Sequence, residues 1–209
     1  MKIVDLIQTG VDQLPFPLAD TLVSKSTAFI DQLCRWNEVY NLTAVQVPEE
    51  MVVRHLLDSL SIAPFIEGSR IIDVGSGAGL PGIPLAILYP AKKFVLLDSN
   101  GKKTRFMTQA VIELELENVV VVQDRVEQYH GEKFDQVLCR AFASLETIAE
   151  KVSHLLHSQG NVLAMKGKQD HDSALAQASP LQVTRVIPIE VPLLDAERCL
   201  VELKYRETR

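Results

Sequence analysis

A glycine-rich stretch at residues 70–84, RIIDVGSGAGLPGIP, constrains the fold of this chain more than any other feature. It opens with the apolar residues Ile71, Ile72 and Val74, passes through four glycines, and resumes an apolar, helix-like pattern over residues 83–89. Glycine adopts backbone angles that a Cβ forbids, and it lets main-chain N–H groups approach a ligand at a helix N-terminus. We therefore predict a strand, a tight turn and a helix that hold a nucleotide-like cofactor on a doubly wound sheet.

The identity of that cofactor is not fixed by the glycines, because residues 77–82 also satisfy the dinucleotide pattern G-x-G-x-x-G. Asp73 stands where an acid can hold a group more positive than a pyrophosphate, and Pro81 and Pro84 remove N–H donors that a pyrophosphate needs. S-adenosylmethionine, which carries an amino group and a sulfonium, fits better than NAD. Asp98 ends a second apolar run at residues 94–98 and is placed to hold ribose hydroxyls of either cofactor.

Composition indicates an ordinary globular chain. Its 209 residues allow one good-sized domain with a small appendage, and they are 47% hydrophobic and 23% charged. No apolar run is long enough to span a bilayer, so we expect a cytoplasmic protein with no membrane partner. The net charge of −6 counts against a protein that coats nucleic acid non-specifically, although a local basic surface remains possible.

We predict no metal site. Three cysteines, Cys34, Cys139 and Cys199, lack the spacing of metal ligands and are interpreted as small buried hydrophobic residues. His154 and His157 are expected one turn apart on a helix, without a third ligand, and are interpreted as surface residues.

Residues 1–66 have helical patterns, with an apolar face along residues 22–40 and a second helix from Pro48 to about residue 60. The second helix carries Arg54, His55 and Asp58. From the residues alone, the favoured interpretation is an exposed Arg54–Asp58 pair at i,i+4 spacing; the alternative is a polar cluster that faces the cofactor.

From residue 70 onward, strands and helices alternate as in parallel β-α-β units. The expected strands after residue 98 are 119–122, 134–138 and 161–166, and the expected helices are 102–115 and 145–157. The tail differs, because two extended runs at 183–191 and 198–205 are joined without a helix. A short connection implies an antiparallel pair, so the final strand should close an otherwise parallel sheet, as in the methyltransferase variant of the doubly wound fold.

The end of the fourth strand bears on which atom is methylated. The Asp/Asn-Pro-Pro-aromatic loop of amine methylation is absent, and Cys139 lacks the preceding proline expected of a nucleophile. Guanine N7 carries a lone pair and no hydrogen, so its methylation needs the guanine to be positioned against the methyl group and needs no general base. Arg140 could orient such a guanine through its fork of N–H donors, or form a salt bridge at the strand end.

With these residues assembled, the chain resembles the small-subunit ribosomal RNA guanine-N7 methyltransferases, the RsmG family, also called glucose-inhibited division protein B. The matching segments are residues 36–37, 40–43, 54–59, 73–84, 97–99, 140–145 and 166–167. The resemblance implies a class I S-adenosylmethionine-dependent methyltransferase, Rossmann-like, with an N-terminal helical extension (1–66) on a methyltransferase domain (67–209). It also implies methylation of guanine N7 near the decoding region, with small-subunit ribosomal RNA or the small-subunit particle as partner.

The resemblance also implies roles by position. Gly75 and Leu80 would meet the methionine end of the cofactor, Val126 and Glu127 its adenine, with Asp124 as a rival, and Arg140 would lie beside the reacting methyl. The full expected cofactor set is Asp73, Gly75, Ser76, Gly77, Gly79, Leu80, Asp98, Ser99, Val126, Glu127 and Arg140. The expected RNA contacts are Arg54, His55, Asp58, Lys102, Lys103, Arg105, Lys166 and Lys168. Phe142 is bulkier than the residue expected at its position.

Three alternatives stay open at this point. One is an NAD-dependent oxidoreductase, although no second substrate domain follows the glycine turn. Another is a non-catalytic ribosome-assembly factor. The third is a small-molecule methyltransferase.

Overall fold

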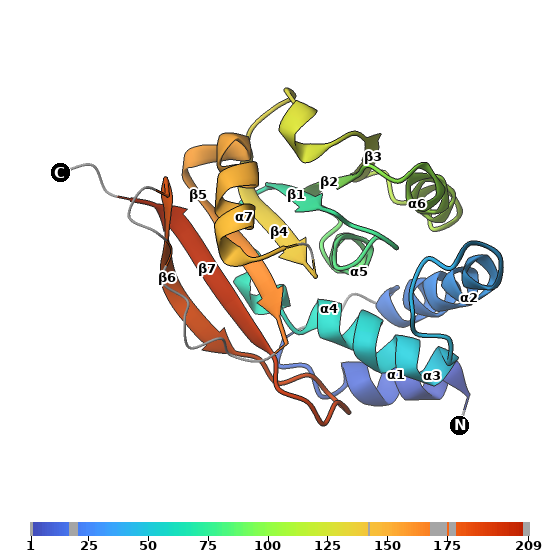
Figure 1. Ribbon diagram of the computed structural model, residues 1–209. Coiled ribbons are helices and arrows are strands. Elements are labelled where there is room, and N and C mark those ends of the chain that lie inside the picture. Colours follow the sequence, from blue (N-terminus) through green and yellow to red (C-terminus); the bar gives the residue numbers. More distant parts are fainter. Residues whose placement is uncertain (1, 17–20, 142, 168–174, 176–178, 207–209) are drawn as a thin grey trace.

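The computed structural model describes residues 2–16, 21–141, 143–167, 175 and 179–206, and its centre is a seven-stranded sheet of order β3-β2-β1-β4-β5-β7-β6 (Figure 1). Strands β1 to β5 are parallel, and β7 runs antiparallel to both β5 and β6. The antiparallel final pair predicted for the tail is therefore confirmed. The strands are β1 (Arg70–Val74), β2 (Lys93–Asp98), β3 (Val119–Gln123), β4 (Phe134–Arg140), β5 (Leu156–Lys166), β6 (Leu181–Pro188) and β7 (Cys199–Tyr205).

Helices cover both faces of this sheet. Those of the N-terminal region are α1 (Ile3–Val11), α2 (Leu22–Tyr40), α3 (Pro48–Met51), the π-helical η1 (Val52–Leu57), α4 (Asp58–Leu60) and the short η2 (Ala63–Phe65). Those that follow are α5 (Gly82–Leu88), α6 (Gly101–Glu113), η3 (Val126–Gln128), α7 (Leu145–Val152) and η4 (Ser153–Leu155). Asn100 caps α6 by accepting a hydrogen bond from the Lys102 amide, and Ser144 caps α7 in the same way from Thr147.

Alternating strand residues divide the core into two layers. Ile71 and Leu96 belong to the cluster that the N-terminal helices, α5 and α6 complete, whereas Ile72 and Val95 belong to the cluster under α7. Figure 1 shows α7 on one side of the sheet and α5, α6 and the N-terminal helices on the other. The N-terminal helices therefore share one apolar core with the sheet.

Close packing also joins α1 to η1. A Cβ added to Gly10 would lie 2.3 Å from Leu57 Cδ1, so a larger residue here would require the Leu57 side chain to move. The helix predicted from Pro48 to about residue 60 exists, but its middle is wound as a π-helix, which the apolar spacing did not predict.

The helix predicted for residues 145–157 is wrong in its second half. Helix α7 ends at Val152, and the chain enters β5 at Leu156, which pairs with Phe134 on β4. The 3-10 turn η4 lies between α7 and β5, and Leu155 at its end and Leu156 at the start of β5 are both buried. His154 and His157 are exposed, but they do not lie on one helix.

Within the described residues, no helix combines the length and the apolar character needed to cross a membrane. Cys139 and Cys199 are buried as predicted, and Cys34 is half-buried against Met51.

Candidate functional site

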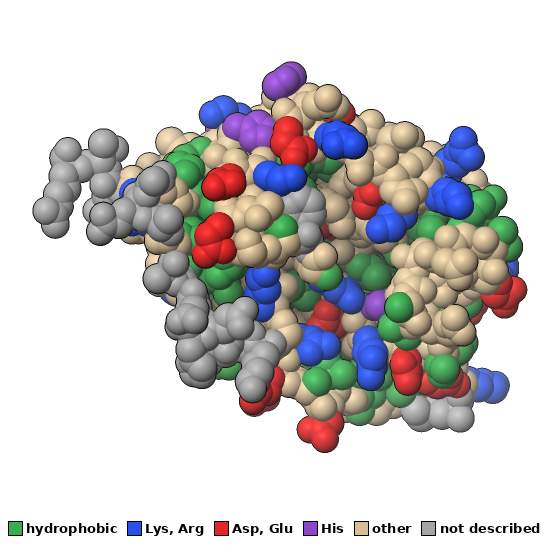
Figure 2. All heavy atoms as spheres, in the orientation of Figure 1, with side chains coloured by type: hydrophobic (Ala, Val, Ile, Leu, Met, Phe, Trp, Pro, Cys, Tyr) green, Lys and Arg blue, Asp and Glu red, His purple; other side chains and the backbone are tan. Residues whose placement is uncertain are grey.

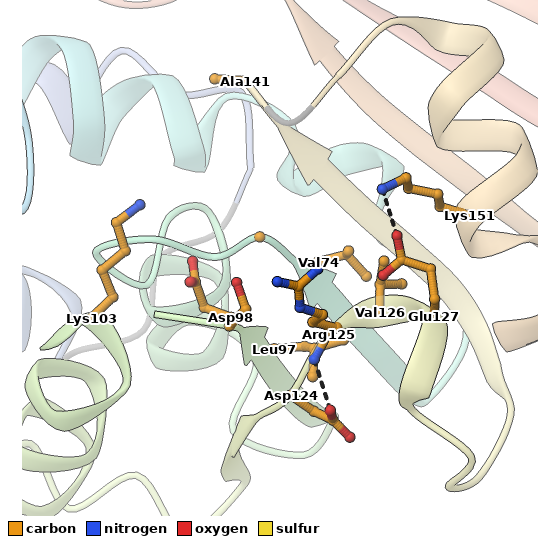
Figure 3. A pocket seen from close by; sticks show the side chains of 12 residues that line it. Val74, Leu97, Asp98, Lys103, Asp124, Arg125, Val126, Glu127, Ala141 and Lys151 are labelled. Carbon is orange, nitrogen blue, oxygen red and sulfur yellow. Dashed lines mark hydrogen bonds and ion pairs between the residues drawn. The ribbon is translucent and has the colours of Figure 1, made fainter. Parts of the chain in front are cut away.

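A cavity of about 400 Å³ lies at the carboxyl ends of β1, β2 and β3, where a doubly wound sheet binds its ligand (Figure 3). Its lining comes from the ends of four strands and from the segments that follow them. The lining residues are Val74, Gly75, Leu97, Asp98, Ser99, Lys103, Asp124, Arg125, Val126, Glu127, Ala141 and Lys151.

Asp98, in the cavity wall, holds the glycine turn by a hydrogen bond. Its carboxylate accepts hydrogen bonds from the Gly77 amide at 2.9 Å and from the Asn100 amide at 2.8 Å. Gly75 and Gly77 have φ angles of 70° and 59°, which residues with a Cβ rarely adopt. The carboxylate is therefore fixed at the cavity wall by main-chain donors, and its remaining lone pairs are free to accept ligand hydroxyls.

Asp73 lies just behind the cavity wall, adjoining Val74 in the chain. Its side chain is fully buried; Oδ2 accepts the Gly82 amide at 2.9 Å, while Oδ1 has no partner among the described residues. Burial raises the pKa of Asp73 to about 7, against the opposing effects of the Gly82 amide and Arg140. A buried carboxylate oxygen without a partner is costly, so this site fits a ligand that brings a positively charged donor.

The opposite wall of the cavity is charged. Lys151 on α7 donates to Glu127 Oε1 at 2.5 Å, and the amide of Arg125 donates to the Asp124 side chain at 2.8 Å (Figure 3). The Lys151 ion pair lowers the pKa of Glu127. Val126 supplies a buried apolar surface between these groups, as a planar ring would require.

A polar cluster of Arg140, Asp58, His55, Ser59 and Arg198 lies beside the end of β4. Arg140 contacts the Arg54 carbonyl at 3.0 Å, His55 Nδ1 at 2.9 Å, Ser59 Oγ at 3.4 Å and Asp58 Oδ2 at 3.5 Å. Figure 2 shows basic, acidic and histidine side chains together in the hollowed centre of this face. Three of the five N–H donors of Arg140 thus form hydrogen bonds to the N-terminal helices, and its Nε makes an ion pair with Asp58.

The protonation of His55 follows from its neighbours. Its Nδ1 lies between a donor, Arg140 Nη2 at 2.9 Å, and an acceptor, the Arg54 carbonyl oxygen at 3.0 Å, and its Nε2 pairs with the Thr43 hydroxyl at 2.7 Å. Burial, with the Arg140 charge, lowers the pKa of His55 to about 4. Thr43 is itself held by Asn37, whose Oδ1 accepts the Thr43 amide at 2.8 Å, so the end of α2 supports the cluster.

The favoured interpretation of Arg54 and Asp58 as an exposed pair is wrong. Asp58 is buried and contacts Arg140 and Arg198, whereas Arg54 is exposed and lies 3.9 Å from Glu50. The π-helical winding of η1 changes which residues share a helix face, and this explains the failure of the i,i+4 argument. The structure does place His55 and Asp58 in a polar cluster with Arg140, but none of the three lines the cavity.

The other residues expected at the site lie in the cavity wall, in the glycine turn behind it, or elsewhere on the surface. Gly75, Asp98, Ser99, Lys103, Val126 and Glu127 line the cavity, while Ser76, Gly77, Gly79 and Leu80 form the turn behind it. Lys102 and Arg105 are exposed on α6, and Lys166 donates to the Ala143 carbonyl at 2.7 Å. Lys168 and Phe142 lie outside the described residues.

Sequence reasoning missed Arg125, Lys151 and Arg198. Arg125 could have been found between Asp124 and Val126, but Lys151 and Arg198 reach the site only through the fold. Among the described residues, no group of three or more His, Cys, Asp or Glu side chains is placed to hold a metal ion.

Comparison with solved structures places the fold among S-adenosylmethionine-dependent methyltransferases. A SAM-dependent methyltransferase from Aquifex aeolicus superposes with a TM-score of 0.58 at 16% identity, over 78% of this chain and 96% of that one. The magnesium protoporphyrin IX methyltransferase of Synechocystis, solved with bound SAM, gives a TM-score of 0.56 at 17% identity, over 86% and 97%. At these identities the likeness establishes the fold alone.

Comparison with curated proteins is more specific. The ribosomal RNA small subunit methyltransferase G of Psychromonas ingrahamii is 45% identical over 98% of this chain and 99% of its own length. That of Hydrogenovibrio crunogenus is 48% identical over 97% and 94%. The family model described as GidB, rRNA small subunit methyltransferase G, matches residues 23–201. The chain therefore belongs to the GidB family of ribosomal RNA small subunit methyltransferases.

Proposed function

We propose that this chain transfers the methyl group of S-adenosylmethionine to N7 of a guanine in small-subunit (16S) ribosomal RNA, near the decoding region. The observation that carries the proposal is the pairing of a nucleotide-sized cavity with the Arg140 cluster at the end of the neighbouring strand. Family membership supports ribosomal RNA as the substrate and accounts for the use of S-adenosylmethionine. A ribosomal RNA substrate also places the protein in the cytoplasm.

The cavity residues fit this cofactor. We infer that Oδ1 of Asp73, just behind the cavity wall, accepts its ammonium group, and that Gly75 at the wall and Leu80 in the turn behind it adjoin the methionine end. In this proposal Asp98 and Ser99 bind the ribose, and the Val126 surface with Glu127 or Asp124 binds the adenine; all five residues line the cavity. When bound, the cofactor supplies an electrophilic methyl group on a sulfonium.

The chain itself supplies position rather than proton transfer. Guanine N7 carries no hydrogen, so no group on the protein has to act as a base. His55, with its pKa near 4, is neutral and hydrogen-bonded on both nitrogens, which suits a positioning role.

Three of the five N–H donors of Arg140 form hydrogen bonds to the N-terminal helices, and its Nε lies 3.5 Å from the Asp58 carboxylate. We infer that Arg140 meets guanine with its remaining Nη1–H and its positive charge. We infer that residues 1–66 form an extension whose work is to hold this guanidinium in place against residues 67–209. The shared apolar core supports that division of labour.

The test is transfer of labelled methyl from S-adenosylmethionine to RNA from a strain that lacks this gene, offered as naked RNA and as small subunits. The product is mapped by cleavage specific for N7-methylguanine. Label at one guanine is expected, and it also identifies the competent form of the substrate. Cofactor binding without label on either substrate would overturn the assignment.

An arginine variant separates catalysis from assembly. Arg140→Ala should bind cofactor but form little or no N7-methylguanine, because the target guanine loses its partner. A non-catalytic assembly factor would instead yield no product even as wild type.

A further inference from the structure

A second cavity, of about 460 Å³, lies next to the cofactor cavity and is not used by the proposed reaction. The two share the same elements, because Asp124 and Lys103 line the first, and their chain neighbours Gln123 and Thr104 line the second. The lining of the second includes Trp36, Thr104, Arg105, Thr108, Gln109 and Gln123.

The aromatic wall of this second cavity is held firmly from within. Trp36 packs against the fully buried Phe106 at a centroid distance of 5.7 Å in an edge arrangement, and against Tyr40 at 5.2 Å. Trp36 itself is only half-buried. Its indole is therefore a fixed, partly accessible ring at the surface.

The polar wall of the second cavity has unused hydrogen-bonding capacity. Gln123 Oε1 accepts a hydrogen bond from Thr104 Oγ1 at 3.2 Å, and among the described residues its Nε2 has no acceptor. Gln109 donates Nε2 to Glu113, which leaves its Oε1 as an acceptor. An acceptor and a donor amide beside a ring can bind the edge of a nucleobase.

A positive charge completes the second cavity. Arg105 is exposed, and among the described residues no acid lies within ion-pair distance of it. The lining contains no carboxylate, although the chain as a whole has a net charge of −6. An aromatic face, uncommitted amides and an unpaired arginine are the combination that binds single-stranded nucleic acid.

We propose that this cavity binds a second nucleotide of the substrate RNA, distinct from the methylated guanine, with its base stacked on Trp36 and its phosphate on Arg105. The inference rests on the proposed function, because an RNA whose guanine reaches the cofactor cavity must pass over the adjoining surface. A base held here anchors the RNA on the β3 side of the cofactor cavity, opposite the Arg140 cluster at the end of β4.

Trp36 is the single tryptophan of the chain, so its emission reports on this cavity alone. The experiment titrates the full-length protein, with and without S-adenosylhomocysteine, with the RNA substrate that accepts methyl, and records tryptophan fluorescence. Saturable quenching is expected, since a stacked base quenches indole emission. Methyl transfer to the same RNA without any change in emission would overturn this inference and leave the proposed function standing.

Variants distinguish specific contacts in this cavity from the general attraction between RNA and a positive charge. Arg105→Ala and Gln123→Ala should raise the RNA concentration for half-maximal quenching several-fold, on the order of three- to tenfold, with cofactor affinity unchanged. Arg35→Ala is the matched control, because Arg35 is exposed on the same helix as Trp36 but does not line the cavity. Equal effects of Arg105→Ala and Arg35→Ala would contradict the proposal.

Steady-state kinetics test whether a base stacks on Trp36. Trp36→Leu should raise KM for RNA on the order of tenfold, and Trp36→Phe should restore most of it, because phenylalanine keeps a ring. A purely structural Trp36 would instead lower Tm in both variants and leave KM unchanged in the folded fraction. Quenching without any methyl transfer would sink the proposed function but keep RNA binding at this cavity.

Discussion

Arg198 donates a hydrogen bond from Nε to Asp58 Oδ1 across 2.9 Å, although the two residues are 140 positions apart in the chain. The other oxygen of the same carboxylate lies 3.5 Å from Arg140 Nε. One buried acid from the N-terminal helices thus holds two guanidinium groups, one at the end of β4 and one just before β7. The position of Arg140 is therefore determined by a residue outside the sheet.

Replacing Asp58 should uncouple Arg140 from the N-terminal helices. Asp58→Ala leaves two partly buried arginines without their shared acceptor, and we expect a loss of roughly 3 kcal/mol of stability. Because the target guanine is then misplaced, kcat should fall at least tenfold, while KM for S-adenosylmethionine changes little. Steady-state kinetics and thermal unfolding measure the two effects.

A glutamate serves as the control for Asp58. Glu50→Ala removes an exposed carboxylate 3.9 Å from Arg54 and should leave both kcat and Tm near wild type. If Asp58→Ala behaved like Glu50→Ala, the positioning role of Asp58 would have to be abandoned.

The raised pKa of Asp73 predicts pH-dependent cofactor binding. Its value of about 7 means that the ionised form, which accepts the cofactor's ammonium, becomes populated as pH rises through neutrality. Affinity for S-adenosylmethionine should therefore increase from about pH 5 to about pH 8 and then level off. Asp73→Asn should bind more weakly and without this slope, which calorimetric titration can measure.

The raised pKa of Asp73 should have the opposite effect on the stability of the protein without cofactor, which should decrease as pH rises. Between the unfolded value of 3.8 and about 7, the folded state keeps a proton that the unfolded chain has released, so the free energy of unfolding should fall as pH rises. Asp73→Asn should remove that fall. A wild-type dependence indistinguishable from that of the variant would show that Asp73 titrates normally.

Gly82 should tolerate no side chain. An added Cβ would lie 2.2 Å from Leu96 Cδ2 and 2.9 Å from Asp73 Oδ2, both of which belong to buried residues. Gly82→Ala should cost roughly 1–3 kcal/mol and weaken cofactor binding, because relief of the clash displaces the Asp73 carboxylate. Gly167→Ala, where nothing lies within 4 Å of the added carbon, should be neutral in the same denaturant and binding measurements.

Glu202 on β7 should make part of the protein's stability sensitive to acid. Burial pushes its pKa upward, but hydrogen bonds from Arg185, Asn161 and Thr184 outweigh burial and lower the pKa to about 2. The stability that Glu202 contributes is present above the unfolded value of 4.5 and is lost as pH falls towards 2.

Urea unfolding of Glu202→Gln tests this contribution. The variant should be less stable than wild type near pH 7, and the difference should shrink as the medium is acidified. The exposed Glu190→Gln should show no such pH-dependent difference. If Glu202→Gln were less stable than wild type by the same amount at all pH values, the shape of the side chain and not its charge would matter at this position.

The fold could be predicted because its signals are local. Each element is predicted from its own residues: the strand from the apolar run Arg70–Val74, the turn from the glycines after it, and the last strand from the alternation over Cys199–Tyr205. Together they predict a parallel sheet with an antiparallel final strand. The cavity could be predicted for the same reason, since Gly75 and Asp98 directly follow or end predicted strands.

The Arg140 cluster could be predicted only in part. Its members come from η1, β4 and the segment before β7, and no spacing in the sequence records that Arg198 reaches Asp58. The π-helical turn alters the helix face by one residue, and an argument from 3.6-residue periodicity cannot detect such a change. Contacts that the fold alone creates are therefore the ones that sequence reasoning missed.

The shared core of the N-terminal helices also has a consequence for biosynthesis. Phe29, Leu33 and Leu56 are buried in a cluster that needs Ile83 and Phe106, which are translated later. A nascent chain released only as far as residue 66 exposes these side chains with nothing to cover them, so this region is completed only after the sheet begins to form.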